Sequence, residues 1–162
     1  MAALPRPTHI LDVDPQWVCD AVAIGVAADA LGVGERLLEM TVHYAKVRHQ
    51  FGRPIGSFQV TKHKLADMLI ALKGLRAATY YAAMSVDANS SDATTAAAVA
   101  KAFAAEYVPA IAGHALQIHG GIGFTWEHDL HLYLRRAKTD EVLGGDAHHH
   151  HDRVARALAD TS

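Results

Sequence analysis

The sequence predicts an all-α protein, folded as an antiparallel up-down bundle of helices. Strand signals are scarce, because no stretch alternates β-branched and polar residues and no Asn-Gly or Asp-Gly turn separates two apolar runs. Apolar residues recur instead at helical spacing. The segments between the expected helices are short, which favours antiparallel neighbours.

The first expected helix begins at Pro15 and runs to about Val47. Asp14 is suited to cap it, and proline at the first helical position loses no hydrogen bond there. Residues 1–13 are expected to form a tail, and residues 14–162 a single four-helix-bundle domain. The apolar stripe of the first helix consists of Val18, Val22, Leu31, Leu38, Val42 and Ala45.

A connector over Gly52–Ser57, which contains Pro54 and Gly56, separates the first helix from the second. Ser57 is expected to cap the second helix, which ends near Asp87. The apolar stripe of this helix consists of Leu65, Met68, Leu69, Leu72, Leu75, Ala82 and Val86.

The third expected helix is rich in alanine and follows a polar loop at residues 89–92. Either Asp92 or Thr94 is expected to begin it, and it ends near His119. Pro109 removes one backbone hydrogen bond inside it, so we expect one bent helix. The two glycines that follow are suited to a left-handed C-cap.

Two shorter helices complete the predicted bundle. After a loop over Gly121–Trp126, the first is expected at His128–Val142. Gly144 and Gly145 interrupt the chain, and the last helix is expected at Asp146–Asp160.

Composition argues against several classes of protein. Hydrophobic residues make up 51% of the chain and charged residues 20%, with 15 basic residues against 17 acidic ones. This balance indicates neither disorder nor a nucleic-acid-binding surface. No uninterrupted apolar run predicts a membrane span, and no signal peptide is expected. The single cysteine, Cys19, cannot form an internal disulfide and is expected in the core of a cytoplasmic protein.

A first candidate binding motif, RHQFGRPIGSFQ, lies where the first helix ends and the second begins. It contains Arg48, Phe51 and Gln59. Arginine suits a pyrophosphate because its planar guanidinium donates two parallel charge-assisted hydrogen bonds, and a nearby helix N-terminus adds oriented N–H groups. The alternative is an arginine and a glutamine that merely hold a loop.

A second motif, QIHGGIGF, spans Gln117 to Phe124 and places three glycines at a helix end. Their bare backbone permits close approach by a ligand, although capping alone explains at least one of them. The pattern is not the GxGxxG that opens a helix after a strand. The second motif indicates a ligand-binding site only in combination with the first motif.

The histidine-rich segments predict no metal site. His148 to His151 are consecutive, and successive residues of a helix point about 100° apart, so they cannot all face one ion. The stretch Trp126–His131 lacks the paired Glu-x-x-His motifs of a di-iron bundle.

The motif RHQFGRPIGSFQ, followed later by QIHGGIGFTWEHDLHLYLRRAK, resembles the C-terminal domain of the acyl-CoA dehydrogenase family from Asp14 onward. The resemblance implies flavin adenine dinucleotide (FAD) shared across a subunit interface. Arg48 and Gln59 would reach its phosphates and adenine part, and the neighbouring subunit would contribute Gln117 to Gly121. The implied cofactor-binding residues are Arg48, Phe51, Gln59, Gln117, Ile118, His119, Gly120, Gly121, Asp146 and His148.

The resemblance also implies that the catalytic base is missing. Family members remove the α-proton of the thioester with a glutamate, while the flavin takes the β-hydrogen as hydride. In many members this glutamate precedes the last helix, where this chain has Gly144. Others carry it on the first helix, roughly seven turns before the arginine, which lands near Val22 with only Asp20 close by. Asp146 is a possible substitute, but a helix N-cap is its more natural role.

The chain is therefore similar to the non-catalytic subunit of actinobacterial heteromeric acyl-CoA dehydrogenases, many of which process steroid thioesters. The resemblance implies a homo- or heterotetramer, at least a dimer, that meets acyl-CoA and electron-transfer flavoprotein as a complete enzyme. Activity of the isolated chain is not expected, because the family's other two domains are missing from it. Two alternatives stay open: an oligomerisation scaffold that has lost flavin, and an enzyme fragment that uses Asp146 as base.

Overall fold

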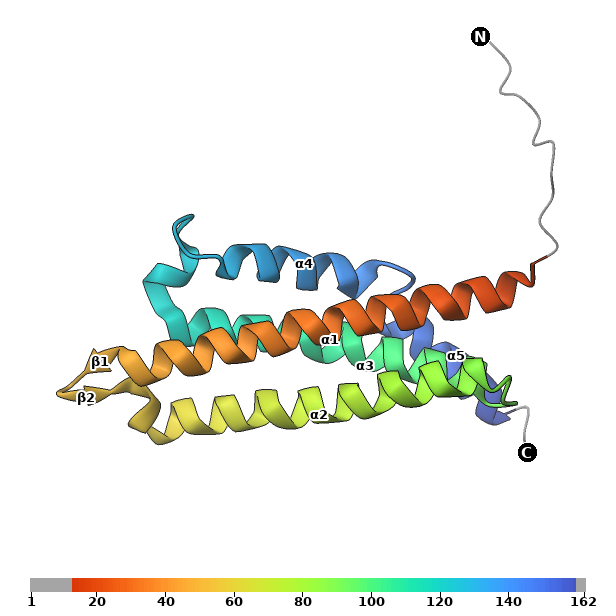
Figure 1. The fold of residues 1–162 in the computed structure, drawn as a ribbon, viewed down its shortest axis with the longest axis horizontal. Coiled ribbons are helices and arrows are strands. Elements are labelled where there is room, and N and C mark those ends of the chain that lie inside the picture. The colour runs from red at the N-terminus through yellow and green to blue at the C-terminus, as the bar shows by residue number, and fades with distance from the viewer. Residues whose placement is uncertain (1–12, 160–162) are drawn as a thin grey trace, which may run out of the picture.

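The computed structural model describes residues 13–159, so most of the expected tail and the predicted end of the last helix lie outside the described residues. The described chain is helical apart from two strands of two residues each, which confirms the all-α prediction (Figure 1). Its elements are α1 (Pro15–Val47), β1 (His49–Gln50), β2 (Arg53–Pro54), a 3-10 turn η1 (Ile55–Ser57), α2 (Gln59–Asp87), α3 (Ala93–His119), a 3-10 turn η2 (Gly120–Phe124), α4 (Leu130–Val142) and α5 (Ala147–Ala159).

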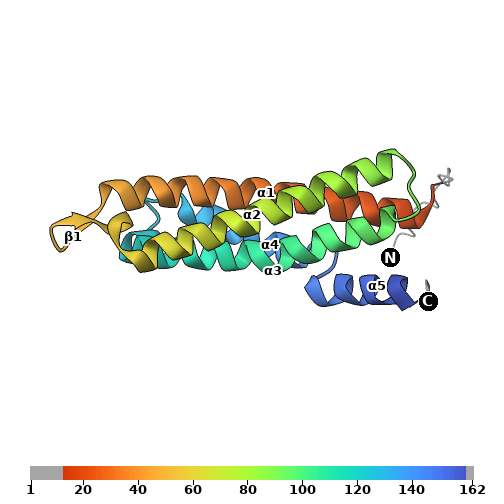
Figure 2. The same ribbon diagram turned by 90° about the horizontal axis from the view of Figure 1, so that it is seen from below.

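Helices α1 to α4 lie side by side, each antiparallel to the next, and α5 lies along the outer side of α3 (Figures 1 and 2). The β1–β2 hairpin, the start of α2 and the end of α3 gather at one end of the bundle, which we call the hairpin end. The core lies between α1, α2, α3 and α4, and much of it is alanine. Its members larger than alanine are Leu31, Val33, Leu37, Met68, Leu72, Leu75, Val108, Ile111 and Leu130.

Helix α1 begins and ends where the sequence predicts. Asp14 caps it, since its Oδ1 accepts a hydrogen bond of 2.9 Å from the backbone N–H of Gln16. The N-terminal part of the predicted stripe is wrong, however, because Val18 and Val22 are 43% and 45% exposed. Alanines turn inward there instead, so the helices approach closely and a larger side chain is not needed to fill the core.

Helix α1 is also the one helix of residues 13–159 that is long and apolar enough to cross a membrane. Its most apolar window is 44% buried inside the protein, against α2, α3 and α4. Gly34 lies so close to α2 that an added Cβ would stand 2.6 Å from a methyl carbon of Leu72. These contacts are those of a central core helix.

The hairpin between α1 and α2 was not expected from the sequence. His49 pairs with Pro54 and Gln50 with Arg53, and the turn residues Phe51 and Gly52 have φ angles of 53° and 76°. Two left-handed residues form the turn that suits a tight hairpin, but phenylalanine is not a residue that signals it.

Of the expected starts of α2 and α3, the one at Ser57 is wrong and the one at Asp92 is confirmed. Ser57 does not cap α2; its hydroxyl donates to the carbonyl of Pro54 at 2.7 Å, and Phe58 stands at the N-cap without a side-chain hydrogen bond. Asp92 stands at the N-cap of α3, but its carboxylate accepts the hydroxyls of Tyr81 and Ser90 instead of a helix amide.

Helix α3 continues through Pro109 as a single helix, as expected. Gly120, with a φ of 61°, ends it, and η2 occupies most of the expected loop. Helix α4 starts two residues later than predicted. Asp146 caps α5 as expected, because its Oδ1 accepts from the N–H of His149 at 2.8 Å. Cys19 is exposed, so its expected place in the core is wrong.

Candidate functional site

The residues of the first motif lie at the hairpin end with their side chains largely free. The backbone of Arg48 is fixed, since its N–H donates to Tyr44 at 2.9 Å and its carbonyl accepts from Ile55 at 2.8 Å. Its exposed guanidinium has no hydrogen bond or ion pair within residues 13–159. Phe51 is 90% exposed, and Gln59, the first residue of α2, is exposed as well. These side chains are available to a ligand.

The N-terminus of α2 brings the positive end of a helix dipole to this end of the bundle. Because Phe58 provides no capping side chain, the first N–H groups of this 29-residue helix have no side-chain cap within the described part of the chain. Arg53 lies nearby, with its guanidinium carbon 4.2 Å from the centre of the Phe58 ring. Unpaired amides beside Arg48 and Arg53 match the chemistry of a pyrophosphate.

The second motif places a buried histidine beside exposed backbone. His119 is 3% exposed, and its ring stacks on Tyr44 at a centroid distance of 4.5 Å. Its Nδ1 lies 2.8 Å from the carbonyl of Ala115, so Nδ1 carries the proton, and Nε2 is left as a buried acceptor without a partner among residues 13–159. Burial lowers the pKa of His119, which keeps the ring neutral. An added Cβ on Gly120 or Gly121 would meet nothing within 4 Å, so a ligand can approach the backbone there.

A hollow of about 500 Å³ lies between the start of α2 and the end of α3. The second motif lines part of this hollow, and the first motif ends one residue before its lining begins. Gln117 is exposed and Ile118 partly buried at its rim, next to Val60 and Thr61. Seven residues line this hollow: Val60, Thr61, Lys64, Gly113, His114, Gln117 and Ile118. The structure thus brings the two motifs to the same end of one chain. It leaves Asp146 and His148 apart, at the start of α5.

The two positions expected to carry a catalytic glutamate meet in space. Gly144 has a φ of 73°, and an added Cβ would stand 3.2 Å from Cγ1 of Val22 on α1. Side chains at the two positions would therefore begin next to each other. Neither carries a carboxylate in this chain.

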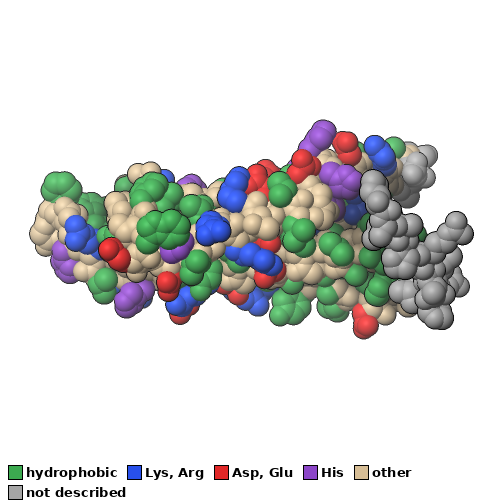
Figure 3. Space-filling view, turned by 90° about the horizontal axis from the view of Figure 1, so that it is seen from above, with side chains coloured by type: hydrophobic (Ala, Val, Ile, Leu, Met, Phe, Trp, Pro, Cys, Tyr) green, Lys and Arg blue, Asp and Glu red, His purple; other side chains and the backbone are tan. Residues whose placement is uncertain are grey.

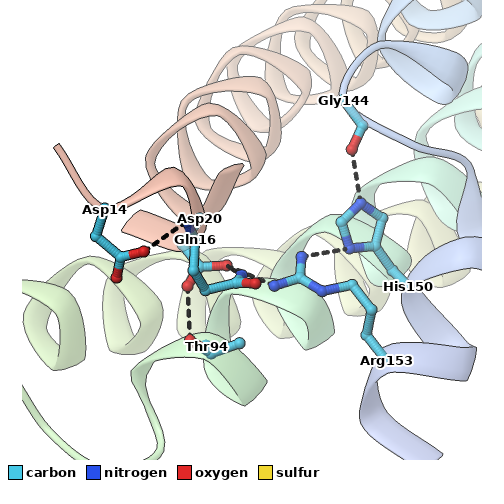
Figure 4. Close-up of polar contacts among 7 residues, drawn as sticks. All are labelled: Asp14, Gln16, Asp20, Thr94, Gly144, His150 and Arg153. Atoms are coloured by element: carbon cyan, nitrogen blue, oxygen red, sulfur yellow. Dashed lines mark hydrogen bonds and ion pairs between the residues drawn. The ribbon is translucent and has the colours of Figure 1, made fainter. Parts of the chain in front are cut away.

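The carboxylates of Asp20 and Asp146, which lie close in sequence to Val22 and Gly144, accept hydrogen bonds from other groups. Asp20 is 4% exposed and accepts hydrogen bonds from Gln16 at 2.9 Å, Thr94 at 2.7 Å and Arg153 at 2.5 Å (Figure 4). The N–H of His149 lowers the pKa of Asp146, so this carboxylate is a weaker base than a free one. The geometry gives neither aspartate a role as a base.

The consecutive histidines diverge. His150 is buried against the carbonyl of Gly144, with 2.9 Å between Nε2 and the oxygen. His148 lies 3.9 Å from Asp152, and His151 lies 3.9 Å from Glu106. These side chains have separate partners and do not converge on one point.

Comparison with known proteins decides the family. The profile of the acyl-CoA dehydrogenase C-terminal domain matches residues 17–159. The chain belongs to the acyl-CoA dehydrogenase family. Within this family it is 44% identical to acyl-CoA dehydrogenase IpdE2 of Mycolicibacterium smegmatis over 144 residues, which are 89% of this chain and 44% of IpdE2.

Two solved structures share the fold. The ChsE4–ChsE5 complex of Mycobacterium tuberculosis is 39% identical, with a TM-score of 0.85 over 90% of this chain and 40% of that one. A variant of the Tcur3481–Tcur3483 steroid ACAD is 32% identical, with a TM-score of 0.87 over 90% of this chain and 40% of that one. The chain spans less than half the length of these relatives.

Sequence reasoning missed a buried polar network in this acyl-CoA dehydrogenase domain. Besides Asp20 and Arg153 it includes Lys101, which is fully buried on α3 and donates to the carbonyl of Gly145 at 2.6 Å. A lone lysine within an alanine-rich helix was the available signal. The periodicity of apolar residues does not report such a group.

Proposed function

We propose that this chain is the FAD-binding and oligomerising C-terminal domain of an acyl-CoA dehydrogenase that takes its catalytic glutamate from another chain. Bound FAD supplies the acceptor for a hydride in the α,β-dehydrogenation of an acyl-CoA thioester. The observation that supports a glutamate from another chain is that Val22 and Gly144 lie against each other and neither is a glutamate. In this role residues 14–162 form the domain, in a cytoplasmic enzyme.

The residues at the hairpin end fit a dinucleotide. Arg48 and the unpaired amides of α2 suit the phosphates, and Phe51 offers an exposed aromatic face for the adenine part. Gln59, and Gln117 to Gly121 from a neighbouring copy, complete the proposed grip, with Ile118 and His119 supporting that segment. The exposed Asp146 and His148 would contact the flavin from the start of α5.

Exposed aromatic side chains support an oligomer. Phe51, Phe124 and Trp126, all near the hairpin end, are 90%, 74% and 80% exposed. Hydrophobic side chains are exposed at this end on the face seen from α4, and others are scattered towards the opposite end (Figure 3). Exposed aromatic clusters of this kind mark protein interfaces. The proposed partners are other acyl-CoA dehydrogenase subunits, and the two-component ChsE4–ChsE5 complex supports a heteromer. The steroid ACAD supports a steroid-type thioester as the substrate class. Electron-transfer flavoprotein is the proposed electron acceptor, as the family resemblance implies.

Arg48→Ala is expected to weaken the binding of FAD by at least about tenfold, since one charge-assisted hydrogen bond to phosphate contributes about 1.5–3 kcal/mol. The measurement is the change in flavin fluorescence as FAD is titrated into the purified chain. Arg156→Ala, an exposed arginine on α5, is the matched control and should bind like the wild type. Equal affinity in both variants would remove Arg48 from the site. No binding to the wild-type chain would favour a scaffold without flavin.

Replacing Phe124 and Trp126 together by serine is expected to dissociate the oligomer into single chains, because a fully desolvated aromatic anchor commonly contributes at least about 2 kcal/mol to an interface. Size-exclusion chromatography with light scattering measures the mass. Leu158→Ser on α5, where Leu158 is 65% exposed, serves as the control and should keep the wild-type mass. An unchanged mass in the double variant would place the interface on another face.

A further inference from the structure

Two buried side chains hold the loop between α4 and α5 by its backbone. The ammonium group of Lys101 on α3 donates to the carbonyl of Gly145 at 2.6 Å and to that of Glu141 at 3.3 Å. From α5, Nε2 of His150 lies 2.9 Å from the carbonyl of Gly144 (Figure 4). Consecutive carbonyls of one loop are thus bound from two different helices.

Burying a lysine and a histidine costs free energy that a simple turn does not require. Lys101 is fully buried, its hydrogen-bond acceptors are neutral carbonyls, and burial lowers the pKa of its ammonium group. Gly144 and Gly145, with φ angles of 73° and 104°, already allow the chain to reverse without help. The buried lysine and histidine therefore do something that the turn itself does not need.

A chain of contacts fixes the tautomer of His150. Its Nε2 faces a carbonyl and so carries the proton, which leaves Nδ1 as an acceptor 3.4 Å from the guanidinium of Arg153. Arg153 in turn is held by the buried carboxylate of Asp20 on α1. The contacts of Thr94 and Gln16 complete the shell of Asp20, so α1, α3 and α5 all contribute to holding the loop.

We propose that Lys101 and His150 are positioning residues that keep the loop over residues 143–146 in one conformation, with Gly144 against Val22, before any ligand or partner binds. The role of this loop as the place where a thioester meets a carboxylate from another chain rests on the proposed function. A loop ordered in advance loses no conformational entropy on binding, which raises affinity and holds reacting groups in register.

Hydrogen exchange at the amide of Gly145, which donates to Val142 at 3.1 Å, reports the order of the loop in the full chain without flavin. His150→Phe fills the space but has no donor, and His150→Gln keeps a donor in a smaller side chain. Since one hydrogen bond is worth about tenfold in an opening equilibrium, we expect exchange about tenfold faster in the Phe variant and within about threefold of wild type in the Gln variant. A packing role predicts the reverse order, and that result would overturn the proposal.

Lys101→Met tests the second contact, because methionine keeps the apolar stem and loses the donor. Exchange at Gly145 is expected to accelerate about tenfold, while the core amide of Leu37 stays unchanged. Lys73→Met, an exposed lysine on α2, is the matched control. Unchanged exchange at Gly145 in a folded Lys101→Met chain contradicts the proposal. If that variant does not fold, the two His150 variants decide.

The pH dependence of exchange at Gly145 distinguishes a hydrogen-bonding role of His150 from a space-filling one. Protonation puts a second proton on Nδ1 of His150, facing Arg153 and with Lys101 and His149 close by, while Asp20 lies beyond Arg153. The protection factor of Gly145 is expected to fall on acidification in the wild type and to stay level in His150→Gln. A level profile in both chains overturns the role of His150. Because no flavin is added, failure of FAD binding leaves these results intact, and their failure leaves FAD binding intact.

Discussion

Replacing Asp20 by alanine is expected to lower the free energy of unfolding by about 3–5 kcal/mol, the range for breaking a buried ion pair. Asp20 is 4% exposed and is the common acceptor for Arg153, Thr94 and Gln16. Alanine removes all three acceptor contacts at once and leaves the guanidinium, whose side chain is 18% exposed, without a counter-charge. Urea unfolding followed by circular dichroism at neutral pH measures the loss.

Two comparisons make this result specific. Asp67→Ala removes an exposed carboxylate from α2 and is expected to change stability by less than about 0.5 kcal/mol. Asp20→Asn keeps the size and part of the hydrogen bonding, so it should fall between alanine and wild type. A loss below about 1 kcal/mol in the alanine variant would show that the network around Asp20 contributes little.

Asp140→Asn is expected to stabilise the protein above pH 6. Asp140 is 2% exposed, and neither carboxylate oxygen has a hydrogen-bond partner within the described residues. Burial and the neighbouring Asp29 raise its pKa to about 6, although Arg136 at 3.3 Å and Lys101 oppose this rise. The folded chain therefore holds a proton that the unfolded chain releases near pH 4. Stability that is present below pH 4 is lost as pH rises to about 6.

Asparagine stays neutral throughout, so the loss should disappear from the variant. A rise from pKa 3.8 to about 6 corresponds to about 3 kcal/mol, an upper value because the pKa of the coupled Asp29 is lowered and compensates in part. Urea unfolding between pH 4 and pH 8 measures the two profiles. Glu39→Gln, which neutralises an exposed acid on α1, is the control and should follow the wild type. Parallel profiles for wild type and Asp140→Asn would contradict the raised pKa.

The helices were predictable because their ends carry local signals. The pair Asp14 and Pro15 starts α1, Gly120 ends α3 and Asp146 starts α5, each through contacts within a few residues. The hairpin was not predictable, because Phe51 adopts a left-handed conformation that its residue type disfavours. The inward face of α1 was assigned incorrectly because alanines form it, and alanine signals a buried face weakly.

In the candidate site, too, residues of local motifs were predictable and contacts between distant residues were not. Arg48, Gln59 and Gln117 belong to continuous motifs and were predicted, and the structure brings both motifs to one end of the bundle. The network around Asp20 joins residues far apart in the sequence, with Arg153 as its partner on the last helix. Such pairings follow from the packing of α5 against α3, which no local pattern encodes.

The length of α1 separates the Gly144 region from the proposed phosphate-binding residue Arg48. At the rise of an α-helix, Val22 beside Gly144 lies about 37 Å from Val47, which precedes Arg48. That span exceeds the length of an extended FAD molecule, so one cofactor cannot touch both places in the same chain. Under the proposed function, each chain serves two separate reaction centres. In a mixed assembly, a copy with a damaged Arg48 would then deprive its neighbour of flavin while its own Gly144 region still met an intact one.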